Sequence, residues 1–84
     1  MIQAVIKVNG RYFAGFSDEL YKTKTTGYGC HGDDQLNKIK LTAKREDAKL
    51  LEGQRNIKSA VDSLFLRVQD GVLNLKKIEI LKVN

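Results

Sequence analysis

Apolar and polar residues alternate through two short runs at the start of the chain, a pattern that indicates β-strands. The runs, Ile2 to Val8 and Arg11 to Phe16, are separated by Asn9-Gly10. Asn-Gly favours a two-residue type I′ turn because both central residues of that turn need a positive φ. We therefore expect a β-hairpin in which Val8 pairs with Arg11 next to the turn.

The same register divides the hairpin into two faces. Continued pairing would set Ile6 opposite Phe13 on the face that we expect to form the core. That face carries Ile2, Ala4, Ile6, Val8 and Phe13. The opposite face carries Val5, Tyr12 and Phe16, which is more apolar surface than a fully solvated face should have. We expect a partner or another segment to cover this second face.

The alternation breaks down from Ser17 to Lys38, where we expect a long loop with a strand near Tyr21 to Thr26. Order returns from Lys38 to Thr42, because Ile39 and Leu41 alternate with lysines and predict a short strand.

Two helical segments are predicted next. The first runs from Ala43 to Glu52, with Thr42 as its N-cap and Gly53 at its end. The second, Gln54 to Gln69, carries an apolar stripe at helical spacing, and a single continuous helix across Gly53 is the alternative. The stripe consists of Ile57, Ala60, Val61, Leu64, Phe65 and Val68.

A last strand is predicted from Leu75 to Val83, with apolar side chains on both faces, which favours a central position in the sheet. The order of elements predicts a single α+β domain over residues 1–84. Its core would be a small, mostly antiparallel sheet of about four strands, beginning with the N-terminal β-hairpin and packed on one long amphipathic helix.

The composition agrees with one small globular domain. The chain has 84 residues, of which 42% are hydrophobic and 30% charged. A single cysteine excludes an intramolecular disulfide, and the N-terminus lacks the basic and apolar regions of a signal peptide. These features predict a cytoplasmic protein that does not associate with a membrane.

The glycine-rich segment Gly27 to Asp34 holds the only cysteine and the only histidine, Cys30 and His31. Adjacent residues of an extended chain point to opposite sides, so these two do not form a catalytic pair, and we expect no enzymatic activity. Structural zinc sites use paired cysteines and histidines, which this segment lacks. We expect no metal or cofactor, although two alternatives stay open for this loop: a zinc site shared across an oligomer, and anion binding beside Lys22 and Lys24.

The formal net charge is +5, and basic residues concentrate in the middle of the chain. Lysines interleaved with Tyr21 and Tyr28 are what a surface that binds single-stranded nucleic acid needs, namely stacking platforms and phosphate partners. Acidic residues are interleaved with the same lysines. Nucleic-acid binding is therefore the second hypothesis for function.

A protein partner is the first hypothesis. Leu66 lies almost opposite the centre of the helical stripe, and it adds to the apolar second face of the hairpin. Small domains often supplement a thin core by association, so a partner protein or a homodimer fits these surfaces. The predicted partner-binding residues are Val5, Tyr12, Phe16, Tyr21, Lys22, Lys24, Tyr28, His31 and Leu66.

The order of segments along the chain resembles that of other known proteins. The opening VIKVNGRYFAGF, the segment AKREDAKLLEG, the amphipathic helix and the closing IEILKV resemble the short accessory proteins of temperate phages and prophages. This resemblance implies a protein that binds and modulates or inhibits a host protein, as phage inhibitors of host nucleases and CRISPR effectors do. Many such inhibitors are acidic mimics of DNA, whereas this chain is basic, so it would act by occupying a protein surface.

Overall fold

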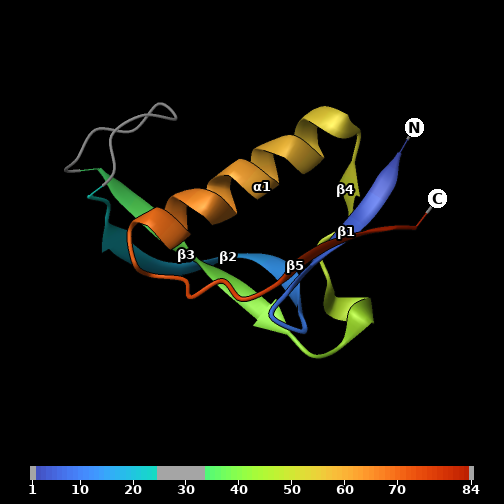
Figure 1. Ribbon diagram of the computed structural model, residues 1–84, viewed down its shortest axis with the longest axis horizontal. Coiled ribbons are helices and arrows are strands. Elements are labelled where there is room, and N and C mark those ends of the chain that lie inside the picture. Colours follow the sequence, from blue (N-terminus) through green and yellow to red (C-terminus); the bar gives the residue numbers. More distant parts are fainter. Residues whose placement is uncertain (1, 25–33, 84) are drawn as a thin grey trace.

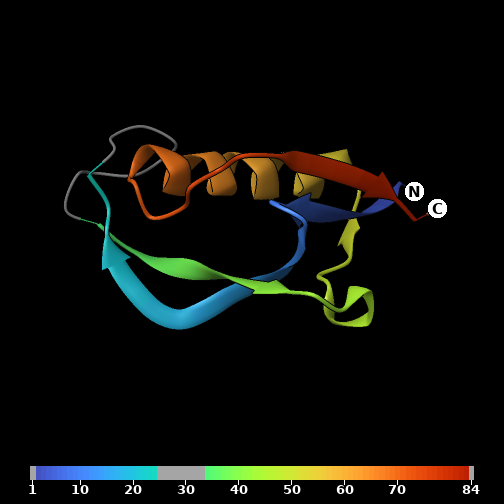
Figure 2. The ribbon, with the colours of Figure 1, turned by 60° about the horizontal axis from the view of Figure 1, so that its bottom comes forward.

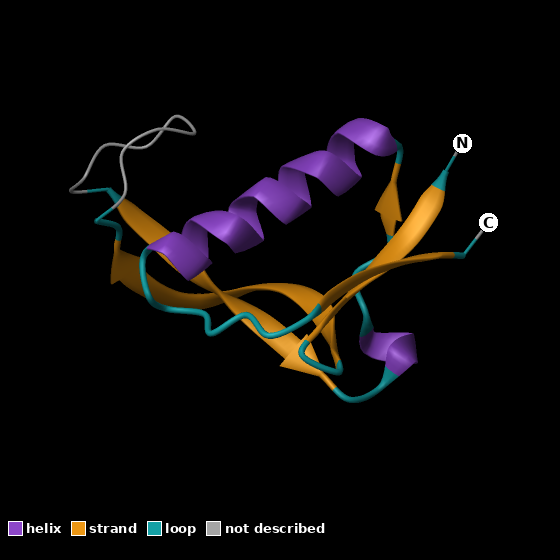
Figure 3. Ribbon diagram, viewed as in Figure 1, coloured by secondary structure: helices purple, strands orange, loops and turns teal. Residues whose placement is uncertain are grey.

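The sheet is built around its first strand, β1. A computed structural model describes residues 2–24 and 34–83 of the chain (Figures 1 and 3). The elements in chain order are β1 (Gln3–Val8), β2 (Arg11–Lys22), β3 (Gln35–Thr42), a 3-10 helix (Arg45–Asp47), β4 (Leu51–Glu52), α1 (Gln54–Gln69) and β5 (Ile78–Lys82). All strand pairings are antiparallel, which gives the small α+β fold that the sequence predicts.

β1 has neighbours along both edges. One edge pairs with β5 from Ala4 opposite Lys82 to Val8 opposite Ile78. The other edge is shared, because β2 pairs with the C-terminal end of β1 and β4 pairs with its N-terminal end. The sheet is therefore split between β2 and β4.

The predicted hairpin turn is confirmed. Asn9 and Gly10 have φ values of 53° and 84°, as a type I′ turn requires, and Val8 pairs with Arg11. Pairing of β1 with β2 stops after a second pair, so the predicted pairing of Ile6 with Phe13 does not form. β2 instead turns away with β3 as a curved two-stranded ribbon, which Figure 2 shows passing below α1.

The long helix has the predicted bounds, but the helix expected from Ala43 to Glu52 is wrong. A short 3-10 turn and β4 occupy that segment. The reason is tertiary pairing: the Lys49 N–H donates to the Phe13 carbonyl at 2.8 Å, and Leu51 pairs with Ala4. Gly53, with φ of 85°, is the N-cap residue of α1 and excludes a single continuous helix.

The last strand is shorter than predicted and lies at an edge. Among the residues that the structure describes, β5 pairs with β1 alone, so the predicted central position is wrong and β1 is the central strand. Apolar residues on both faces of β5 misled the prediction, because the edge position leaves Ile80 50% exposed.

The core lies between α1 and the strands β1, β2 and β4. The buried cluster contains Ile6, Val8, Phe13, Leu51, Ala60 and Leu64. Toward its C-terminal end α1 buries Arg67 and Leu66, whereas Phe65, expected in the stripe, is 38% exposed. The buried side of the helix shifts toward Arg67 because this side chain contacts the carbonyl of Asn37 in β3.

Candidate partner-binding surface

Four of the nine predicted site residues are either buried or lie outside the described residues. The side chains of Val5 and Leu66 are buried, at 4% and 5% exposure, so neither forms the exposed apolar surface that the sequence predicted. Alternation and helical spacing did not reveal this burial, because it depends on the tertiary fold. Tyr28 and His31 lie outside the described residues, as does most of the glycine-rich segment.

Two of the three aromatic residues of the predicted set on β2, Tyr12 and Phe16, lie near the split in the sheet. Tyr12 is half-buried, with the Lys7 ammonium 5.3 Å from its ring centre. Phe16 is 44% exposed and packs edge-on against Phe13, with ring centres 5.4 Å apart. Phe16 thus joins the core on one side and presents apolar surface on the other.

A buried arginine holds the exposed ring of Phe16 in place. Arg67 on α1 is 5% exposed and donates from Nε and Nη2 to the Asn37 carbonyl at 3.0 and 2.7 Å. Its Nη1 donates to the Ser63 carbonyl at 2.9 Å, and the guanidinium lies 4.8 Å from the Phe16 ring centre. These contacts tie α1 to both strands of the ribbon.

The spacing of apolar residues along α1 points to the burial of this arginine. Arg67 follows Ala60 by seven residues and Leu64 by three, and both spacings place it on the buried side of α1. A charged side chain at such a position needs hydrogen-bond partners inside the fold, and the carbonyls of Ser63 and Asn37 supply them.

The far end of β2 is fixed to the C-terminal end of α1 by Asp70. One oxygen of this carboxylate accepts from the Tyr21 hydroxyl at 2.8 Å and from the Thr23 hydroxyl at 2.5 Å, and the other accepts from the Lys24 backbone N–H at 3.0 Å. Thr23 is fully buried, whereas the side chains of Lys22 and Lys24 are exposed. Tyr21 therefore has a structural role, which weakens its predicted role as a stacking platform.

The split in the sheet opens a cavity that we call the split-sheet cleft. It has a volume of about 570 Å³ and lies between β2, β4 and α1. Its apolar lining comes from Phe13, Phe16, Leu50 and Leu51, and Leu50 is 44% exposed, like Phe16. Polar side chains of α1, Asn56 and Ser59 among them, form the facing wall.

A second groove, which we call the edge groove, lies between α1 and β5. It has a volume of about 390 Å³ and a mostly apolar lining. Ile57 and Val61 come from α1, and Ile80 comes from β5. The lysines Lys58 and Lys82 also line this groove, so its charged groups are cationic.

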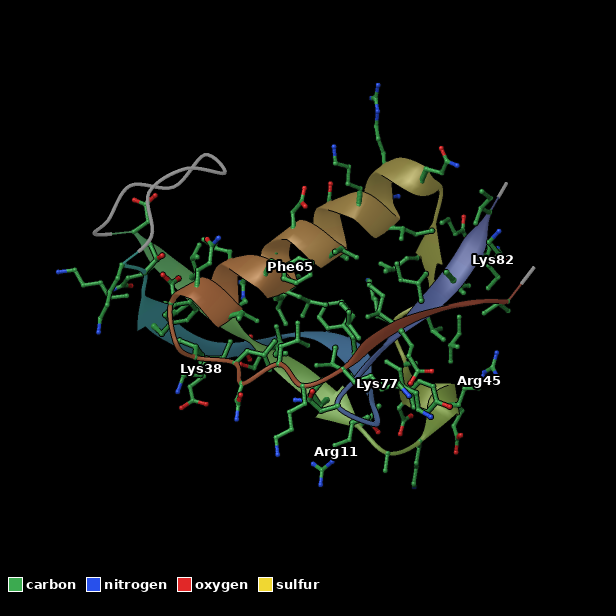
Figure 4. The ribbon with its side chains drawn as sticks, in the orientation of Figure 1. Arg11, Lys38, Arg45, Phe65, Lys77 and Lys82 are labelled. Carbon is green, nitrogen blue, oxygen red and sulfur yellow. The ribbon has the colours of Figure 1, made fainter. Side chains whose placement is uncertain are left out.

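The basic residues do not gather in one place. Figure 4 shows Lys38 on the left and Arg45 on the right of the molecule, with Arg11 and Lys77 between them. Lys38 is also within 3.5 Å of the Glu19 carboxylate. Within the described part of the chain, no group of three or more histidine, cysteine, aspartate and glutamate residues is placed to hold a metal ion.

Comparison of the chain with models of protein families, with curated proteins and with solved structures found no match. In the described ranges 2–24 and 34–83, no helix combines the length and the apolarity needed to cross a membrane.

Proposed function

We propose that this chain is a non-enzymatic interaction domain that binds a partner protein and modulates or inhibits it. The observation that carries the proposal is the split-sheet cleft, where Phe16 and Leu50 each remain 44% exposed beside a buried apolar floor. Aromatic and apolar anchors surrounded by polar groups are typical of the energetic centre of protein interfaces. Arg67 supports the same use, because it holds Phe16 in one orientation before binding.

The resemblance to phage accessory proteins extends this proposal to the kind of partner. It favours a host protein, such as a nuclease or a CRISPR effector, in the cytoplasm of an infected cell. The net charge of +5 argues against imitation of a nucleic-acid duplex, so inhibition would follow from occupation of a protein surface.

A crosslinking experiment tests the proposal. A photoreactive amino acid at position 50 is expected to capture a protein from host cells, whereas the same group at the exposed position 72 captures none. With the purified partner, Leu50→Asp should weaken binding at least about tenfold, and Val72→Asp should leave it unchanged. The proposal fails if position 50 captures no protein while the chain binds bare nucleic acid tightly.

Nucleic-acid binding is the second candidate, favoured by the exposed side chains of Lys22 and Lys24 and by the net charge of +5. Each phosphate neutralised by a lysine releases counterions, so the affinity should fall steeply as salt is added. Fluorescence anisotropy with labelled single-stranded DNA at several salt concentrations measures this slope. A flat response, or no binding at low salt, would exclude this candidate.

A further inference from the structure

Within residues 2–24 and 34–83, no strand pairs with the outer edge of β5, so its outward backbone groups form a defined pattern. The Val83 N–H donates to the Gln3 carbonyl and the Asn9 N–H donates to the Lys77 carbonyl, each at 2.8 Å. In an antiparallel pair, hydrogen-bonded residues alternate with residues whose N–H and C=O groups point away from the partner strand. The odd-numbered residues of β5 therefore bond to β1, and the backbone groups of Ile78, Ile80 and Lys82 point outward.

These outward-pointing residues lie beside the edge groove. Ile80 is paired with the buried Ile6, and Lys82 is paired with Ala4, so their side chains lie on the core face of the sheet. Across the groove, α1 contributes Ile57 and Val61. A strand added to β5 would thus place every second side chain in an apolar groove that already exists.

We propose that the free edge of β5 binds an extended segment of the partner protein as an additional antiparallel strand. The segment carries an apolar residue opposite Ile80 and a carboxylate opposite Lys82. Because the added strand runs antiparallel, the acidic residue precedes the apolar one by two positions. This inference rests on the proposed function, since it names the chemistry of the partner and a way in which it binds.

The charges around the groove select the occupant. Lys58 and Lys82 both line it, and a carboxylate at this position would neutralise them. A second copy of the chain supplies no such group. In every register of β5 paired with itself, only even-numbered residues come opposite Lys82, and Lys76, Ile78, Ile80 and Lys82 are all basic or apolar. Two copies would also each bring a net charge of +5.

A synthetic peptide tests the backbone part of the proposal. The peptide Ser-Glu-Thr-Ile-Thr-Val-Ser, blocked at both ends, places its glutamate opposite Lys82, its isoleucine opposite Ile80 and its valine opposite Ile78. We expect saturable binding to the full chain, measured by changes in the amide chemical shifts of Ile78, Ile80 and Lys82. Methylation of the isoleucine nitrogen, which faces β5, should weaken binding at least about tenfold. Methylation of the preceding threonine nitrogen, which faces away, is the matched control and should change affinity less than about twofold.

A charge exchange tests the acidic part. Replacing the peptide's glutamate with lysine should weaken binding about tenfold at low salt, and Lys82→Glu in the chain should restore binding of the lysine peptide. Absence of binding by the parent peptide, equal losses from both methylations, or no rescue by Lys82→Glu would overturn the inference. So would a dimer in sedimentation equilibrium that Ile80→Pro dissociates. If position 50 still crosslinks to a protein when the peptide fails, the proposed function stands and only the strand-addition mode is refuted.

Discussion

Replacement of Arg67 by methionine tests the contact that joins α1 to the ribbon. Methionine keeps an unbranched apolar chain of similar reach but removes three donated hydrogen bonds, two to the Asn37 carbonyl and one to the Ser63 carbonyl. It also removes the guanidinium from its position 4.8 Å from the Phe16 ring centre. Arg55→Met, at an exposed position on the same helix, is the matched control.

Opposing effects set the size of the loss. Hydrogen bonds from a charged donor contribute about 1.5–3 kcal/mol each, and a cation–π contact contributes about 1 kcal/mol. Removing the charge also relieves the cost of burying it, which amounts to several kcal/mol. We expect Arg67→Met to lower the free energy of unfolding by about 2 kcal/mol and the midpoint of thermal unfolding by about 8–16 °C. Arg67→Lys should lose about 1 kcal/mol, because lysine keeps the charge but cannot form the forked pair of bonds.

Urea denaturation followed by circular dichroism measures these differences. Arg55→Met should change the free energy of unfolding by less than about 0.5 kcal/mol. Because Arg67 is 5% exposed, its effect should persist in high salt, where surface charge effects are screened. If the free energy of unfolding of Arg67→Met lies within about 0.5 kcal/mol of that of the unmodified chain, the contact does not stabilise the packing of α1 on the ribbon.

Other substitutions test the remaining contacts by the same denaturation assay. Leu64→Ala should cost about 2–5 kcal/mol, whereas Phe65→Ala at its exposed position should cost under about 1 kcal/mol, and equal losses would refute the observed orientation of α1. Asn9→Gly keeps the positive φ but removes the side-chain hydrogen bonds to the Asn74 carbonyl and to the N–H groups of Lys76 and Lys77. It should cost about 1–3 kcal/mol, and an unchanged stability would mean that the turn geometry alone matters. Thr23→Val removes the hydroxyl bonded to Asp70 and should cost about 1–2 kcal/mol, and an unchanged stability would mean that the bond to Asp70 contributes nothing.

Local signals were sufficient for part of the fold. Asn9-Gly10 demands a turn that few other pairs adopt, and the apolar stripe that begins after Gly53 demands a helix, so both were predictable. The segment from Ala43 to Glu52 has helix-forming residues, but pairing of Leu51 with β1 stabilises an extended conformation there. No local pattern reveals a bond such as that between Lys49 and Phe13, because its partners are far apart in sequence.

The candidate site was predictable to a smaller extent. The alternation of apolar and polar residues correctly predicted that Phe16 lies outside the central core, and the structure places it at the split-sheet cleft. The burial of Val5 and Leu66 was not predictable, since it follows from how the strands diverge and how α1 is rotated. The edge position of β5 was not predictable, because β5 has apolar residues on both faces, as a central strand also would.

The pairing of β1 with β5 also affects how the chain folds. Ala4 and Lys82 are neighbours in the sheet although almost the whole sequence separates them, so the longest pairing of the central strand forms only after a very large loop closes. Folding rates fall as contacts become less local, and we expect this pairing to form late. The N-terminal end of β1 and the C-terminal end of β5 lie close together in Figure 1. A circular permutant that joins them through a short turn would convert the slowest pairing into a hairpin and should fold faster.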